Sequence, residues 1–317
     1  MDAKPVLVTG ATGLVGGRLL PALAKRGSRV RALTRDPERA RRKLAGGVEA
    51  LAWDGIDVPE AALRGAGAVV HLAGEPIFGG LPNAARRERM HASRVLSTES
   101  IAAALGRLAE SERPRVLVCA SAVGYYGGDR GEAELDESAP PGASFLAELC
   151  KHWEEAAARV ERHGVRRVSL RIGVALAREG GALALMLRPF RLGLGGPLGS
   201  GRQWVPWVHV DDVVGLILLA LDSDAAAGPI NAVAPEPVRN RELTRLLAAR
   251  LRRPAFFPVP GFALRAALGE LAGELLDSRR VVPRRARELG YRFAHATLES
   301  ALDAELGELD ANPAQTE

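Results

Sequence analysis

The sequence predicts an α/β fold in which helices cover both faces of a doubly wound parallel sheet, followed by a smaller helix-rich region. The main observation is that short apolar, β-rich runs alternate with helix-patterned segments through the first half of the chain. The runs are PVLVTG, SRVRALTR, VEALAWD, GAVVHLAG, PRVLVCASA and VRRVSLRIG. The helix-patterned segments include residues 14–26, 85–108 and 144–163.

The second half of the chain predicts a change of architecture. The glycine-rich stretch 193–203 predicts an irregular loop, and WVPWVHVDDVVGLILLALD after it predicts a strand, an acidic helix start and a buried helix. A helix-rich region begins at about Glu236. We therefore expect a larger domain made of residues 1–173 and 205–233, and a smaller one made of residues 174–204 and 234–310.

Composition excludes several classes of protein. The chain has 317 residues, of which 47% are hydrophobic and 26% charged, so it is neither disordered, nor collagenous, nor a small disulfide scaffold. Its longest apolar stretches, such as residues 213–221, are half of the about 20 residues that a membrane helix needs. Cys119 and Cys150 lack metal-ligand spacing and fit a reducing compartment. We expect a soluble, cytoplasmic protein with no membrane partner.

The net charge of +5 comes from 43 basic residues, only four of which are lysine. Attraction to nucleic acid is one interpretation of such a charge. The arginines are scattered, however, often beside Asp or Glu, and aromatic residues are not interleaved with them. We therefore expect no nucleic-acid partner.

The stretch VLVTGATGLVGGRLLPAL near the N-terminus predicts a phosphate-binding turn. A β-rich run stops at Thr9, glycines follow at 10, 13 and 16, and a helical pattern starts. Gly10 permits a tight turn, Gly13 lets a pyrophosphate approach the backbone, and Gly16 lets the helix pack on the strand. The free amides at the helix N-terminus then face the phosphates. The expected contacts with the dinucleotide are Gly10, Thr12, Gly13, Leu14, Val15 and Gly16.

The end of the second strand indicates which nucleotide is bound. Many NAD-binding proteins place Asp or Glu there to hold the ribose hydroxyls. Here Arg35 stands at the strand end, where its guanidinium could hold a 2′-phosphate, while Asp36 and Pro37 predict a helix start. The sequence thus favours NADP(H) over NAD(H), unless Arg35 is only a solvated surface residue. Leu72, Ala73 and Gly74, after the fourth strand, are further expected cofactor contacts.

These segments resemble the extended short-chain dehydrogenase/reductase superfamily, and in particular its nucleotide-sugar epimerase group. The spacing GxxGxxG is typical of that superfamily, and the resemblance becomes closer with the atypical "epimerase family" proteins farther along. It is carried by HLAGEPI, SAVGYYGG, FLAELCKHWEEAA, LRIGVAL, PFRLGLGGPLGSGRQWVPWVHVDD, NAVAPEPVRN and SRRVVPRRARELGYRF. The resemblance covers nearly the whole chain. It implies a Rossmann domain that binds NADP(H), followed by a smaller substrate-binding domain, and it names no substrate.

Catalytic members of the superfamily use Ser, Tyr and Lys, with the last two spaced YxxxK on one helix. The resemblance places the serine at Ser121 and the lysine at Lys151, but Ala147 stands where the tyrosine belongs. Tyr125 and Tyr126 follow Ser121 in one loop at the ligand-binding edge of the sheet, so either could be the proton donor, or could pack against the cofactor or the core. Lys151 could also serve only to bind the nicotinamide ribose. Cys150 is a weaker catalytic candidate.

Arg202, Gln203, Trp204 and Trp207 are the expected substrate contacts. Arginine can hold a phosphate or carboxylate, and tryptophan can stack on a ring. The alternative is that the tryptophans belong to the core and the arginine to an ion pair. Glu75 could act as an acceptor or base in the same cleft, or simply cap a loop.

A metal site is not expected. His209 with Asp211 and Asp212 has the composition of a ligand set, but acidic residues that open a helix explain the pattern.

Taken together, the sequence predicts an NADP(H)-dependent oxidoreductase or epimerase that acts on a small polar, or nucleotide-linked, substrate. The missing tyrosine leaves open a non-catalytic, regulatory or scaffold protein that binds NADP(H), and an isomerase for which the nucleotide is only structural. Related extended members pair two long helices per subunit, so a homodimer through residues 85–108 and 144–163 is also expected.

Overall fold

The computed structural model describes residues 4–43, 47–78, 80 and 83–307, which divide into two compact units. Unit 1 comprises residues 1–125, 146–171 and 214–230, and unit 2 comprises residues 126–145, 172–213 and 231–317. The chain therefore passes from one unit to the other several times. The predicted domain bounds stay a prediction. The assignment of cofactor and substrate to separate domains remains a prediction.

A seven-stranded sheet of order β11-β7-β5-β4-β1-β2-β3 forms the centre of the fold, and it confirms the predicted α/β class. The six predicted strands are β1 (Val6–Thr9), β2 (Val30–Thr34), β3 (Val48–Ala52), β4 (Ala68–His71), β5 (Val116–Ala122) and β7 (Arg166–Ile172), and β11 is Gly228–Ala232. Parallel pairing joins β3, β2, β1, β4 and β5 in turn. The strand order reverses at β1, which is where open α/β sheets bind ligands.

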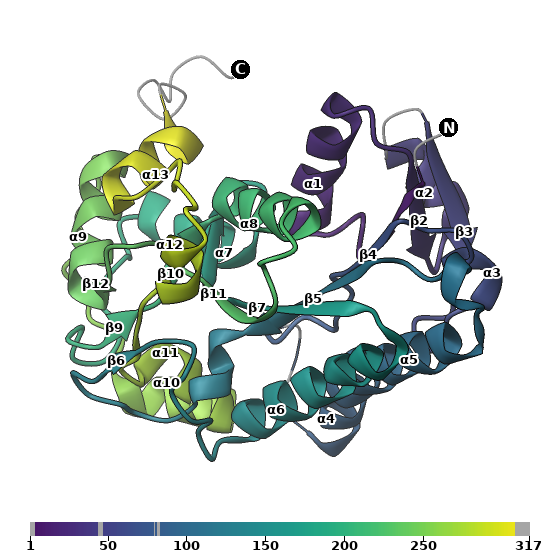
Figure 1. Ribbon diagram of the computed structural model, residues 1–317. Coiled ribbons are helices and arrows are strands. Elements are labelled where there is room, and N and C mark those ends of the chain that lie inside the picture. Colours follow the sequence, from purple (N-terminus) through teal and green to yellow (C-terminus); the bar gives the residue numbers. More distant parts are fainter. Residues whose placement is uncertain (1–3, 44–46, 79, 81–82, 308–317) are drawn as a thin grey trace. The chain divides into compact units, whose positions relative to one another are not determined.

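Helices lie on both faces of this sheet, with α4, α5 and α6 along one face and α1 and α8 along the other (Figure 1). Their bounds are α1 Leu14–Lys25, α2 Pro37–Lys43, α3 Glu60–Leu63, α4 Ala84–His91, α5 Ser97–Arg107, α6 Phe145–Ala158 and α8 Val210–Asp222. Buried aliphatic side chains explain the packing. In α1, for example, Leu19, Leu20 and Leu23 are buried at helical spacing.

Unit 2 has its own core. Its helices are α7 (Gly181–Arg191), α9 (Asn240–Leu251), α10 (Gly261–Leu268), α11 (Gly273–Leu276), α12 (Arg284–Glu288) and α13 (Leu298–Leu306). Its strands pair two by two: β8 (Val174–Ala177) with β10 (Trp207–His209), β9 (Trp204–Val205) with β12 (Val238–Arg239), and β6 (Glu134–Leu135) with β13 (Arg280–Val281). Leucines of α7, α9 and α13 bury Trp207 between them. Within the described residues, no helix is long and apolar enough to cross a membrane.

The predicted helix over residues 85–108 is one continuous helical run, but a π-helical turn at Ala92–Leu96 interrupts it between α4 and α5. The hydroxyl groups of Ser97 and Thr98 bond to the carbonyl oxygen of Arg94 at 3.2 and 2.6 Å. These bonds satisfy a backbone acceptor where the helical register changes. The turn carries Arg94, only 8% exposed, whose guanidinium donates to the carbonyl oxygen of Glu75 at 2.8 Å.

A buried hydrogen-bond chain links β1, β4 and α5. Thr9 Oγ1 accepts the backbone N–H groups of Leu72 and Ala73, each at 3.1 Å, so its own hydrogen goes to His71 Nδ1 at 2.7 Å. His71 Nε2 then carries the ring proton and faces the Ser97 hydroxyl at 3.1 Å. Burial, with a smaller contribution from the charge of Arg94, lowers the pKa of His71 to about 4. The neutral ring is therefore part of the native fold.

The buried His71 in this hydrogen-bond chain makes the free energy of unfolding depend on pH. Between pH 6.5 and 4 the unfolded protein takes up a proton on His71 that the native protein does not, so stability present above pH 6.5 is lost as the pH falls. We expect His71 to account for about 2 kcal/mol of lost unfolding free energy between pH 7 and 4.5. Urea denaturation at both values measures it.

The matched variants are His71→Asn, whose amide oxygen can still accept from Thr9 but does not titrate, and His152→Asn at an exposed position. His71→Asn should lose less stability on acidification than the wild type, and His152→Asn should behave like the wild type. Equal pH dependence in all three proteins would show that His71 is not the group responsible.

Candidate functional site

The turn between β1 and α1 is fixed by backbone contacts at two glycines. Gly10 has a φ of +68°, and a Cβ there would lie 2.7 Å from the carbonyl carbon of Leu72. A Cβ on Gly16 would lie 2.2 Å from the carbonyl oxygen of Gly10. Neither position admits a side chain, because strand end, turn and helix all meet there.

Gly13 differs from these two glycines. It precedes the first residue of α1 with an extended backbone, and no side chain caps the helix. A Cβ there would touch only the carbonyl oxygen of Gly10, at 3.2 Å. A side chain at Gly13 would thus meet one backbone atom in a tight contact, far less than at Gly10 or Gly16, and it would stand next to the helix N-terminus and the positive end of the helix dipole. Thr12, Leu14 and Val15 flank this position, which suits a diphosphate.

The exit of β4 lies against the same turn. Leu72 and Ala73 are held by Thr9, and Gly74 follows, where a Cβ would lie 3.3 Å from Arg94 Cζ. Glu75 is partly exposed; its backbone N–H donates to the Ser93 hydroxyl, and its carboxylate lies 3.8 Å from Arg89 Nε. The structure therefore brings residues 72–75 together with the glycine turn.

Arg35 follows β2 directly and is exposed. Among the described residues its guanidinium forms no ion pair, and its Cδ lies 3.7 Å from the position of a Cβ on Gly55. Asp36 caps α2, since its carboxylate accepts the backbone N–H of Arg39 at 2.9 Å. The prediction that Asp36 and Pro37 start a helix is confirmed.

At the end of β5, Ser121 belongs to a buried polar cluster. Its hydroxyl donates to Glu154 Oε1 at 2.7 Å. Arg171, on the neighbouring strand β7, binds both oxygens of Glu154, at 2.8 and 2.9 Å. All three side chains are at least nine-tenths buried. Ser121 gives its hydrogen to Glu154 and retains only acceptor capacity for a further partner.

Tyr125 completes this cluster, whereas Lys151 does not join it. The guanidinium of Arg171 lies 3.5 Å from the centroid of the Tyr125 ring, a cation–π contact. Lys151 is exposed, with its Nζ 3.9 Å from a Glu155 carboxylate oxygen. Ala147 is fully buried on the helix face that carries Glu154.

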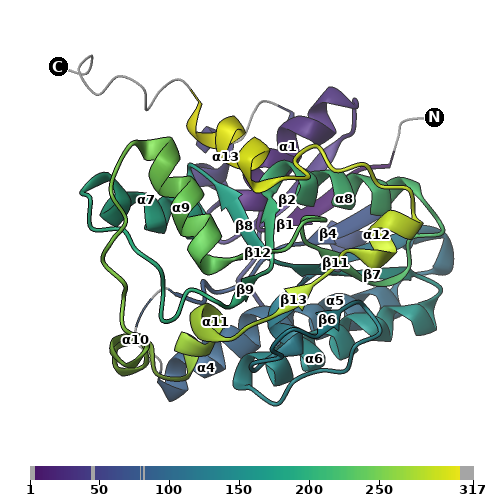
Figure 2. The ribbon, with the colours of Figure 1, turned by 90° about the vertical axis from the view of Figure 1, so that its left-hand side faces the viewer.

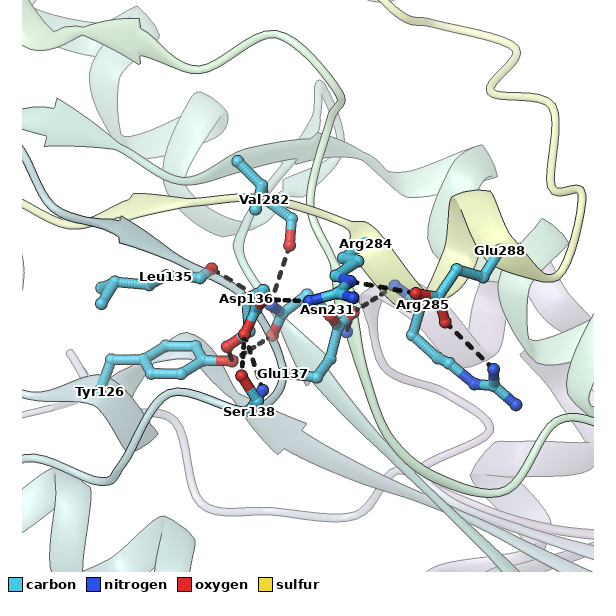
Figure 3. Close-up of polar contacts among 10 residues, drawn as sticks. All are labelled: Tyr126, Leu135, Asp136, Glu137, Ser138, Asn231, Val282, Arg284, Arg285 and Glu288. Atoms are coloured by element: carbon cyan, nitrogen blue, oxygen red, sulfur yellow. Dashed lines mark hydrogen bonds and ion pairs between the residues drawn. The ribbon is translucent and has the colours of Figure 1, made fainter.

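Tyr126 is held differently from Tyr125. It is fully buried in unit 2, and its hydroxyl donates to Asn231 Oδ1 at 2.7 Å and lies 3.0 Å from the carbonyl oxygen of Asp136 (Figure 3). Asn231 in turn donates to the carbonyl oxygen of Val282 at 2.9 Å. This geometry favours packing over catalysis for Tyr126, because its phenol hydrogen is engaged inside a core, and the catalytic role stays a prediction.

The four predicted substrate contacts fall into two groups. Trp207 is 1% exposed and bonds to the carbonyl oxygen of Glu236, while buried Gln203 donates to the carbonyl oxygens of Leu198 and Leu275. Both side chains are buried and hold unit 2 together, which favours a packing role, and their contact with a substrate stays a prediction.

Trp204 and Arg202 are accessible. The Trp204 indole donates to Glu132 at 3.0 Å, and the guanidinium of Arg239 lies 4.2 Å from its ring centroid. Arg202 is exposed, and its carbonyl oxygen accepts from Arg239. These two residues keep the surface that a ligand contact requires.

The histidine and acidic side chains at the start of α8 have hydrogen-bond partners within the protein. His209 Nδ1 accepts the backbone N–H of Asp211 at 3.2 Å, and Nε2 faces Glu305 at 3.0 Å. Asp212 accepts from the Tyr291 hydroxyl and from two backbone N–H groups of the 294–295 segment. His209, Asp211 and His295 do have ligand atoms within 4.8 Å of one another, and His295 is the member of this group that the sequence did not suggest. The absence of a metal remains a prediction.

Sequence reasoning missed Glu154, Arg171 and Arg94. The available signal was helical spacing, since Glu154 lies seven residues after Ala147 and so returns to the same helix face. Arg171 was hidden among 39 arginines. The π-turn that buries Arg94 leaves no trace in hydrophobic periodicity.

Comparison with known proteins agrees with this geometry. The NAD dependent epimerase/dehydratase family matches residues 6–233, and a domain of unknown function (DUF1731) matches residues 259–305. The chloroplastic epimerase family protein SDR39U1 homolog of Arabidopsis thaliana is 41% identical over 94% of this chain and 86% of its own length. The crystal structure of human epimerase family protein SDR39U1 (isoform 2) with NADPH superposes with a TM-score of 0.86 at 35% identity, covering 96% of this chain and all of that one.

A nucleoside-diphosphate sugar epimerase from Corynebacterium glutamicum superposes with a TM-score of 0.77 at 34% identity, covering 96% of this chain and 59% of that one. The family match takes in both the glycine turn of β1–α1 and the Ser121 cluster. The chain therefore belongs to the NAD-dependent epimerase/dehydratase family.

Proposed function

We propose that the protein binds NADP(H), with the diphosphate at the N-terminus of α1 and the 2′-phosphate on Arg35. The observation that carries this proposal is the position of Gly13 at the N-terminus of α1, where a side chain would meet only one backbone atom. The exposed guanidinium of Arg35 and the NADPH in the human relative's crystal structure support it. Gly10, Thr12, Leu14, Val15, Gly16 and residues 72–74 would form the rest of the cofactor site, with Lys151 at the nicotinamide ribose.

The first prediction concerns cofactor choice. NADPH should bind more tightly than NADH, and Arg35→Ala should weaken NADPH binding about ten- to a hundredfold, because a charge-assisted contact to the 2′-phosphate is lost. Binding of NADH should change little. Calorimetric titration of both nucleotides measures this, with Arg42→Ala on α2 as the control for the loss of one positive charge. Unchanged NADPH affinity in Arg35→Ala would contradict the assignment.

The second prediction tests the glycine turn. Gly13→Val should abolish nucleotide binding and leave the fold intact, because valine suits the extended backbone there and its methyl groups take the place of the diphosphate. Gly17→Val, four residues on and with nothing within 4 Å of its Cβ position, is the matched control. Both variants should unfold at similar urea concentrations. A Gly13→Val protein that binds NADPH like the wild type would place the phosphates elsewhere.

We further propose that the protein is an oxidoreductase or epimerase acting on a small polar substrate, with nucleotide-linked compounds as the first class to test. The name of the Corynebacterium structure supports that class. A bound nicotinamide supplies hydride transfer. The chain itself would hold the reacting oxygen and move its proton: Ser121, fixed by Glu154, accepts from a substrate hydroxyl, and Tyr125 exchanges the proton. Arg202 and Trp204 would contact the remainder of the substrate.

The third prediction separates the two tyrosines. With a substrate identified in a screen of carbonyl compounds and nucleotide sugars, Tyr125→Phe should slow turnover by about 10²–10⁴ without changing NADPH affinity. Tyr126→Phe should instead lower the unfolding free energy by about 1 kcal/mol or more, since it leaves Asn231 without its donor. Ser121→Ala should cost less activity than Tyr125→Phe. Full activity in Tyr125→Phe would move the search to Glu75.

A non-catalytic role is the second candidate, and Ala147 in place of the usual tyrosine favours it. A protein that binds NADPH tightly yet turns over nothing in that screen would be better explained as a regulatory or scaffold protein.

We also propose a homodimer that forms through α4–α5 and α6 of each subunit. Light scattering at micromolar concentration tests this oligomeric state.

A further inference from the structure

Two connections in unit 2 expose an unusual number of large apolar side chains. Leu192 and Leu194 lie in the segment after α7, Phe256 and Phe257 lie in the segment after α9, and Phe262 lies on α10. Phe256 is 81% exposed, Phe262 77% and Leu192 75%. These five residues are called the apolar patch below. Side chains this exposed gain nothing from the core, so the fold of unit 2 does not explain them.

The two connections lie side by side. The backbone N–H of Val259 donates to the carbonyl oxygen of Pro197, and that of Gly199 to the carbonyl oxygen of Val259, both at 2.9 Å. Farther along, a Cβ on Gly193 would lie 3.7 Å from Pro254. Figure 2 shows both connections descending along one edge of unit 2 from α7 and α9 toward α10. The patch is therefore one surface drawn from two parts of the sequence.

Helix α10 itself has no buried residue. Its sequence, GFALRAAL, is strongly apolar, and only Arg265 carries a charge. A short helix in water gains most of its stability from packing an apolar face, and α10 packs on the following segment Gly269–Ala272 without burying any of its own residues. This points to an apolar medium outside the chain.

Arginines outnumber acidic residues on the segments that carry the patch. Residues 179–211 and 242–270 contain eight arginines and four acidic residues, a formal charge of +4. Arg188, Arg252, Arg253 and Arg265 are exposed on the same segments as the patch. A surface that combines protruding Phe and Leu with an excess of arginine over acidic groups complements an anionic partner that has an apolar interior.

We propose that the apolar patch and its arginines bind the surface of an anionic lipid bilayer. The phenylalanines and leucines would enter the boundary between head groups and acyl chains, and the arginines would contact lipid phosphates. A bilayer suits these residues because they protrude from loops and a short helix, and lipid needs no matching pocket. The binding is peripheral, so it requires no membrane-spanning helix.

Flotation with lipid vesicles tests the proposal. The full chain should float with vesicles of phosphatidylcholine and phosphatidylglycerol, less with phosphatidylcholine alone, and less again at high salt. The double variant Phe256→Ser, Phe262→Ser should lower the bound fraction about tenfold or more, and so should Arg188→Glu, Arg253→Glu. Phe78→Ser, at an exposed position of unit 1, and Arg42→Glu are the matched controls and should float like the wild type.

All the substituted positions are exposed, so each variant should keep the unfolding transition of the wild type, which urea denaturation checks. Absence of flotation with anionic vesicles, or flotation of the patch variants like the wild type, would overturn the proposal. Light scattering provides a second arm. A wild-type dimer that becomes monomeric when Phe256 and Phe262 are replaced would assign the patch to a second copy of the chain instead.

Discussion

The turn between β1 and α1 depends on one contact, the close approach of Gly10 to the backbone that follows β4. The positive φ of Gly10 turns the chain out of β1, and the missing Cβ lets the turn lie against Leu72. Gly16 then packs on Gly10, which fixes where α1 starts. Thr9 secures the other side by accepting two amides after β4. The end of β1, the start of α1 and the segment after β4 therefore meet at one place. Backbone atoms make most of the contacts there, so the surrounding side chains can vary.

A second constraint is the buried polar cluster of Ser121, Glu154 and Arg171. The hydroxyl hydrogen of Ser121 is bonded to Glu154, which in turn binds Arg171 through both of its oxygens. Removing one member of such a buried pair typically costs about 3–5 kcal/mol, because the other charge stays in the interior without compensation. The cluster is therefore stable as a unit, and a buried polar centre lies beside the helix that carries Ala147.

The fold could be predicted from sequence because its signals are local. Each of the six strands is an apolar run, and the glycine turn has a characteristic spacing. Asp36 and Pro37 together predict the start of α2. The Ser121 cluster could not be predicted, because Glu154 and Arg171 meet only once β7 pairs beside β5. Trp207 and Gln203 show a different limit. Their residue types suit both ligand contact and packing, and only burial distinguishes the two.

The π-helical turn at Ala92–Leu96 makes chain length itself a constraint. Such a turn holds one residue more than the α-helical turn it replaces and absorbs that residue locally, so deleting one residue there would restore a regular α-helix with little change in how α4 and α5 face each other. It would, however, remove the widened turn that carries Arg94. Arg94 would swing away from Glu75, and the segment after β4 would lose its buried support. Insertions and deletions in the helical run from α4 to α5 should consequently be rarer in evolution than substitutions. The length of a helix, and not only its composition, would then be under selection.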